Sequence, residues 1–154
     1  MSMFADPQGD QLDRALESWS WIGIEGKRPI RVTAFGDVFF VDNEGTVWFL
    51  DTLGGSLSAV FGSTEEMDQA LETEDGQDTF LFAGFVQRAV EEGMRLKPGE
   101  CYDWKINPVI GGSVEFENIH VLDLVVAINV AGQIHEQTRH LPPGTIISGF
   151  NVVE

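Results

Sequence analysis

Two turn signals inside a stretch of β-type sequence constrain the fold more than any other feature of the chain. Residues 30–61 are rich in Val, Phe and Trp, which favour strands. Asp42–Gly45 and Asp51–Gly55 interrupt this stretch with residues typical of tight turns. They divide it into an extended region over 30–41 and two strands over 46–50 and 56–61. The pattern predicts an antiparallel β-meander.

Helical periodicity marks the sequence on either side of the meander. Residues 10–21, with Asp10 as N-cap, and residues 79–94 each place apolar side chains at helical spacing. Ser63 and Glu66 are three residues apart, as in a capping box, and predict a short helix after residue 63. Residues 72–78 are expected to form an acidic loop.

The segment 118–140 is ambiguous, because its apolar residues fit one helical face and its β-branched content also fits a strand. The segment Gln133–Arg139 and the Leu141–Gly144 stop favour the helix, and Ile146 and Ile147 suggest a last short strand. Strands and helices are grouped rather than alternating, which is typical of an α+β fold. We therefore predict one domain over residues 1–154, with the meander packed against three to four helices.

The charge of the chain is strongly negative and unevenly distributed. Its 154 residues include 25 Asp and Glu but 9 Lys and Arg, giving a net charge of −16. Residues 1–78 hold 16 of the acids and 4 of the bases, and residues 32–87 contain no base. This balance argues against binding to nucleic acid or to anionic membranes. It fits either plain solubility or an acidic surface that attracts a basic partner.

The candidate motifs for catalysis or metal binding lack the residue spacing that such sites require. His135 and His140 are five residues apart, which on a helix separates them by roughly 140° rather than placing them on one face. The acidic residues 72–78 lack the spacing of a calcium loop. Cys101 stands alone beside Glu100, which raises rather than lowers a thiol pKa. We expect no enzyme, cofactor or metal, and the absence of a secretory signal predicts a cytoplasmic protein.

A series of short motifs, in this order, resembles the C-terminal domain family of type VI secretion DNase-immunity proteins, long catalogued as a domain of unknown function. The resemblance extends from about Leu12 to the end of the sequence. The motifs that carry it are Trp19–Trp21, Gly36–Phe39, Gly45–Asp51, Leu96–Tyr102, Pro108–Gly112, Asn118, Gly132–His135 and Leu141–Gly144.

The resemblance implies an immunity protein that binds and neutralises a basic toxin, a nuclease, by occluding it with an acidic face. The residues expected to contact the toxin are Asp42, Glu44, Glu65, Glu66, Asp68, Glu72, Glu74, Asp75 and Asp78. The alternative is a small-ligand or sensory module without a toxin partner, in which Gly111, Gly112 and Gln133 line a pocket. The sequence predicts neither the apolar anchors of an interface nor the oligomeric state.

Overall fold

A four-stranded antiparallel sheet forms the centre of the computed structural model, which describes residues 2–147, 149 and 151–153. Its strands follow one another in chain order: β1 (Lys27–Val32), β2 (Val38–Asp42), β3 (Val47–Asp51) and β4 (Ser56–Phe61). The predicted meander is confirmed. The extended region 30–41 is two strands, because the backbone turns back between Thr33 and Asp37, where the Thr33 N–H donates to the Asp37 carbonyl oxygen at 2.8 Å.

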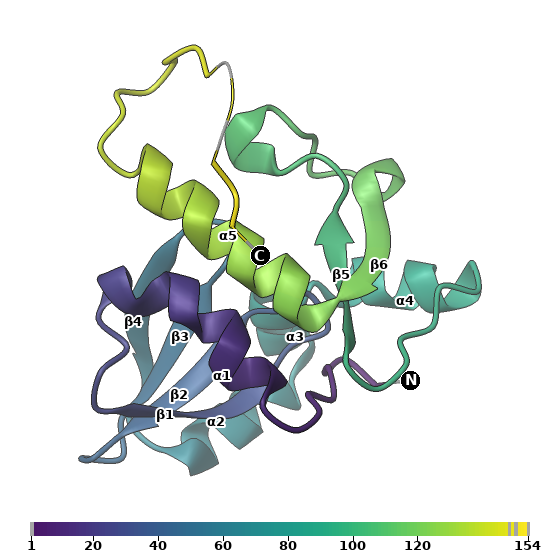
Figure 1. The fold of residues 1–154 in the computed structure, drawn as a ribbon. Coiled ribbons are helices and arrows are strands. Elements are labelled where there is room, and N and C mark those ends of the chain that lie inside the picture. The colour runs from purple at the N-terminus through teal and green to yellow at the C-terminus, as the bar shows by residue number, and fades with distance from the viewer. Residues whose placement is uncertain (1, 148, 150, 154) are drawn as a thin grey trace.

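Helices cover both faces of this sheet (Figure 1). One face packs against α1 (Gln11–Leu16), the 3₁₀ helix η1 (Glu17–Ile22) and α5 (Leu124–Thr138). The other face packs against α2 (Thr64–Leu71) and α3 (Glu74–Leu81). Alternate residues of β2 enter the two cores: Val38 and Phe40 face α5, and Phe39 faces α2.

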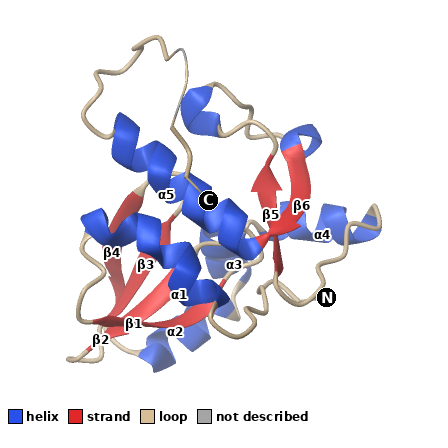
Figure 2. Ribbon diagram, viewed as in Figure 1, coloured by secondary structure: helices blue, strands red, loops and turns tan. Residues whose placement is uncertain are grey.

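A second, two-stranded sheet lies beside the first (Figure 2). It pairs β5 (Glu100–Trp104) with β6 (Ile119–Asp123), and α4 (Ala83–Glu91) packs against it through Val86 and Ala89. Two 3₁₀ helices, η2 (Pro108–Ile110) and η3 (Phe116–Asn118), lie in the connection between β5 and β6. Together the sheets and helices form the expected α+β fold.

Several predicted helix boundaries were wrong. The helix expected over 10–21 is α-helical only to Leu16 and then tightens into η1. The segment expected as one helix over 79–94 is divided at Phe82, whose left-handed backbone (φ 51°) ends α3 before α4 begins. The acidic loop expected over 72–78 is largely the start of α3, because Thr73 caps that helix by accepting the Gly76 N–H at 3.0 Å.

The ambiguous segment 118–140 contains both a strand and a helix. β6 ends at Asp123, whose carboxylate accepts the N–H groups of Val125 and Val126 at 2.9 and 3.3 Å and so starts α5. The strand expected at Ile146 and Ile147 is wrong, since both residues lie in irregular backbone. Across the described residues, every helix is too short or too polar to cross a membrane.

Candidate partner-binding surface

Local capping fixes the two helices that carry most of the predicted contact residues. The Ser63 hydroxyl accepts the Glu66 N–H at 3.2 Å, which confirms the predicted cap, and the Glu66 carboxylate accepts the Gly62 N–H at 2.9 Å. The first turns of α2 and α3 both contain acidic residues. Carboxylates at these positions interact favourably with the positive end of the helix dipole.

The two acidic helices are held close together. A Cβ at Gly76 of α3 would lie 1.9 Å from the Ala70 carbonyl oxygen at the end of α2, so only glycine permits this approach. Underneath, Met67, Leu71 and Leu81 are buried against the sheet. Since the apolar sides of both helices face the core, their carboxylates lie on the solvent side.

Seven of the nine predicted contact residues are gathered on this solvent side, which we call the acidic surface: Glu65, Glu66, Asp68, Glu72, Glu74, Asp75 and Asp78. All seven are exposed, and residues 64–81 contain no Lys or Arg. Within the described residues, the arginine–carboxylate ion pairs join Arg14 to Asp10 and Arg88 to Glu117. Within the described part of the chain, the acids of this surface therefore form no ion pair with Lys or Arg.

Asp42 and Glu44, the other two predicted contact residues, lie apart from the acidic surface. Glu44 is exposed in the turn between β2 and β3. The Asp42 carboxylate is half-buried and accepts the Trp48 indole N–H at 2.9 Å and the N–H groups of Glu44 and Thr46 at 2.9 and 3.0 Å. These hydrogen bonds, the one from Trp48 above all, lower the pKa of Asp42. The Asp42 carboxylate therefore stabilises the turn between β2 and β3.

A buried polar network on the opposite face of the sheet was not predicted. The Asp37 carboxylate accepts the Thr52 N–H and hydroxyl at 2.8 and 2.7 Å, and a His135 ring nitrogen lies 2.9 Å from the Thr52 carbonyl oxygen. Burial and, secondly, the Asp51 carboxylate raise the pKa of Asp37 from 3.8 to about 7, whereas burial lowers the pKa of His135. Asp37 is 2% exposed, so the network joins α5 to the sheet rather than meeting a substrate.

Other singled-out residues also have structural roles. The thiol of Cys101 is buried, and burial followed by the surrounding carboxylates raises its pKa, which disfavours a reactive thiolate. A Cβ at Gly112 would lie 1.7 Å from the Ile106 carbonyl oxygen, so only glycine permits this close backbone approach. Gln133 binds the backbone of Val153 instead of lining a pocket with the glycine pair. The residues of the predicted ligand pocket are thus occupied with backbone contacts.

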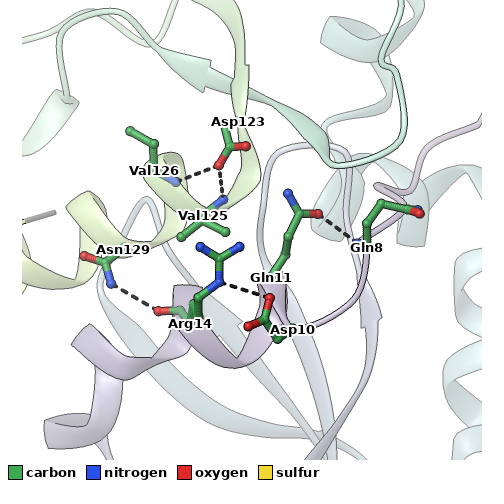
Figure 3. Close-up of polar contacts among 8 residues, drawn as sticks. All are labelled: Gln8, Asp10, Gln11, Arg14, Asp123, Val125, Val126 and Asn129. Atoms are coloured by element: carbon green, nitrogen blue, oxygen red, sulfur yellow. Dashed lines mark hydrogen bonds and ion pairs between the residues drawn. The ribbon is translucent and has the colours of Figure 1, made fainter.

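Exposed apolar side chains gather along the outer side of α5. A groove of about 360 Å³ lies between α5 and the β5–β6 connection, where Ile106 is 57% exposed and Ile110 38% exposed. A second groove, of about 460 Å³, lies between α1 and the start of α5, and Arg14, Asp123, Val126 and Asn129 line it (Figure 3). Val126 lines both grooves. The sequence showed no periodic signal for these apolar sites, because most of them lie in irregular backbone.

Comparisons with known proteins agree with the fold and with the resemblance seen in the sequence. No curated protein sequence matches the chain. Its structure is similar to the crystal structure of Atu4351 from Agrobacterium tumefaciens, with a TM-score of 0.56 and 16% sequence identity. That match covers 84% of this chain but 65% of the other, so the chain spans less than two thirds of that protein. Residues 63–135, from α2 to the last turn of α5, match the family model described as T6SS immunity protein Tdi1, C-terminal.

Proposed function

We propose that the chain is an immunity protein that neutralises a basic nuclease toxin by covering its nucleic-acid cleft with the acidic surface of α2 and α3. The observation that carries the proposal is the family match, which begins at residue 63, where the acidic helices begin. Seven exposed carboxylates without a base among them then provide the charge that such a target requires.

The physical basis is competition for the site that binds phosphates. A nuclease holds its substrate with positively charged side chains, so a surface of carboxylates is attracted to the same cleft. Long-range attraction of this kind increases the association rate more than the final affinity. A nuclease threatens the DNA of the cell, so we place the immunity protein in the cytoplasm.

Tight binding also needs apolar anchors, because a few buried side chains supply most of the energy of an interface. Ile106, Ile110 and Val114, in the connection between β5 and β6, are 57%, 38% and 49% exposed and are available for such contacts. We assign the steering to the acidic surface and the anchors to this connection, which lies beside α5, so the toxin must contact two sides of the molecule.

The test first screens nuclease toxins from the gene neighbourhood of this chain for complex formation, and then uses the toxin that binds. Neutralising three surface acids (Asp68→Asn, Glu72→Gln and Asp78→Asn) should reduce the association rate by roughly tenfold at low salt, with a smaller change in the dissociation rate. Stopped-flow mixing or surface plasmon resonance at several salt concentrations measures both rates. Inhibition of DNA cleavage in the same samples reports neutralisation.

A matched control removes the same charge elsewhere. Asp6→Asn, Glu25→Gln and Glu92→Gln change three exposed acids outside both the acidic surface and the β5–β6 connection. If the two triple variants lose association rate equally, net charge rather than this surface attracts the toxin. If the native chain neither binds the toxin nor inhibits DNA cleavage, the proposed function is wrong.

A further inference from the structure

Two glutamines of α5 hold the backbone of a distant segment, Asn151–Val153. The Gln133 side chain accepts the Val153 N–H at 2.6 Å and donates to the Val153 carbonyl oxygen at 2.5 Å. The Gln137 side chain does the same for Asn151, at 3.2 and 2.7 Å. Figure 1 shows this yellow end of the chain returning over α5. Each amide thus satisfies both backbone groups of one residue.

The spacing of the two glutamines matches that of an extended peptide. Four residues of α-helix rise about 6 Å, and two residues of extended chain span about 6.6 Å. Gln133 and Gln137 can therefore pair with every second residue of an extended chain running antiparallel to the helix. We call these two residues the glutamine ladder. Its contacts use backbone atoms alone, so they do not depend on the side chains of the bound segment.

The ladder is held in place by contacts that do not involve the bound segment. The Asn129 side chain donates to the Arg14 carbonyl oxygen at 3.2 Å, which ties it to α1 (Figure 3). Its own oxygen accepts the second N–H of Gln133 at 2.6 Å. This relay orients the Gln133 amide in advance, which lowers the cost of binding a peptide.

The segment on the ladder is only loosely attached. Asn151–Val153 are all exposed, and the side chains of Val152 and Val153 are 44% and 73% exposed. The net gain from four hydrogen bonds is comparable to the entropic cost of ordering three residues. Val153 also borders the 460 Å³ groove lined by Val125, Val126 and Val130, which offers apolar surface to a better-fitting occupant.

We propose that the glutamine ladder is a docking site for an extended peptide backbone, and that a segment of the toxin replaces Asn151–Val153 on it. The docking site itself, the first half of the proposal, follows from the contacts above. Its occupation by a toxin segment, the second half, rests on the proposed function. A second copy of this chain is a poor occupant, because it would bring two charges of −16 together. Glu17 and Asp123 line the groove beside Arg14, so a segment containing basic residues fits best.

The first half is tested without any toxin, on the full chain. Asn151→Pro with Val153→Pro removes the two N–H donors and releases the segment. An acetylated and amidated peptide of residues 145–153 should then shift the NMR signals of the Gln133 and Gln137 amides. It should bind the native chain more weakly, because the tethered segment competes for the same glutamines. Val152→Pro, in which both donors remain, is the matched control.

Methylated peptides separate backbone recognition from side-chain contact. Methyl groups on the amides of Asn151 and Val153 should weaken peptide binding at least about tenfold, because both hydrogen bonds to the glutamine oxygens are lost. A methyl on the amide of Val152, which points the other way in an extended chain, should have little effect. Equal binding of the two peptides, or no binding to the released variant, overturns the docking site.

The second half is tested by toxin affinity. Gln133→Ala with Gln137→Ala should increase the dissociation rate of the toxin complex at least about tenfold. Gln87→Ala, at an exposed glutamine of α4, is the control. If toxin binds the double variant as tightly as the native chain, the toxin does not use the ladder, although the proposed function stands. If toxin binds neither protein while the peptide binds the released variant, the proposed function fails and the docking site stands.

Discussion

The two faces of the four-stranded sheet are covered by helices held in different ways. On one face, α5 is joined to the sheet by the buried Asp37–Thr52–His135 network and packs backbone to backbone against η1 at Gly132. On the other, α2 and α3 rest on a wholly apolar layer, with Phe39, Phe49, Phe61 and Phe80 in contact, and carry their charges outside. The first arrangement depends on exact interior geometry, and the second on local caps and non-directional burial.

This difference predicts where the chain tolerates substitutions without losing stability. Buried polar groups and close backbone contacts are costly to disturb, whereas exposed charges contribute little to stability. The exposed acids of α2 and α3, which we propose contact the partner, are therefore free to vary without loss of stability. Substitutions on the two sides can test this contrast.

The largest effect is expected at Asp37. Its pKa is near 3.8 in the unfolded chain and about 7 in the folded protein, so folding favours the protonated form. The stability that the neutral Asp37 carboxyl contributes is fully present below the pKa of the unfolded chain. It is lost as the pH rises through the pKa of the folded protein. Asp37→Asn should therefore be more stable than the native chain at pH 8 by up to about 4 kcal/mol, a difference that nearly vanishes at pH 4.

Urea unfolding at pH 4, 6 and 8 measures this effect, with Asp68→Asn on the acidic surface as the control. If the difference in unfolding free energy between Asp37→Asn and the native chain stays the same from pH 4 to pH 8, the Asp37 carboxyl is not held neutral.

A smaller effect is expected at Gly132. A Cβ there would lie 2.2 Å from the Ser18 hydroxyl oxygen and 2.9 Å from the Trp19 ring. Gly132→Ala should lose about 1–3 kcal/mol of unfolding free energy, despite the higher helix propensity of alanine. Gly84→Ala in α4, where the new Cβ meets nothing within 4 Å, should instead gain up to about 1 kcal/mol. Thermal unfolding of both variants measures whether the two changes in stability have opposite signs. If both variants are less stable than the native chain, the contact with η1 has no special role.

On the α2 and α3 side, the caps should matter more than the charges. Ser63→Ala and Thr73→Ala should each lose about 1 kcal/mol, because each leaves one helix N–H without its side-chain acceptor. Chemical unfolding measures both losses. Thr64→Ala, at the exposed first residue of α2, controls for the removal of a hydroxyl.

The smallest effect is expected from the charges themselves. Asp68→Asn, Glu72→Gln and Asp78→Asn together should change the unfolding free energy by less than about 0.5 kcal/mol, since these exposed acids lack ion-pair partners within the described residues. A loss of several kcal/mol in the same unfolding experiment would show that the acidic surface is structural, and the contrast between the two faces would fail.

The sequence predicted the features that depend on neighbours along the chain. The turn residues 42–45 and 51–55 and the Ser63 cap are local signals, and all are confirmed. The division at Phe82 was missed because apolar residues continue at helical spacing through it, and a left-handed non-glycine residue has no sequence signature. The contacts of Gln133 with Val153 were missed because backbone recognition across 20 residues leaves no pattern in the sequence.

Strand β1 was predicted to start too late for an instructive reason. Lys27, Arg28 and Pro29 do not fit the alternation of a half-buried strand, but β1 forms an edge of the sheet. Its inner side pairs with β2, with a shift of register between Pro29 and Arg31. Side chains at an edge need not be apolar, so the β-type pattern begins only at Ile30.

This edge also bears on how the chain behaves at high concentration. An open strand edge invites pairing with another molecule and growth into aggregates. Pro29 supplies no N–H to an incoming strand, the register shift distorts the edge, and residues 3–5 already pair with its end near Val32. Three of the nine bases of the chain stand on the same strand and repel an identical strand laid beside it. Even in a chain so short of positive charge, β1 is thus protected from polymerisation.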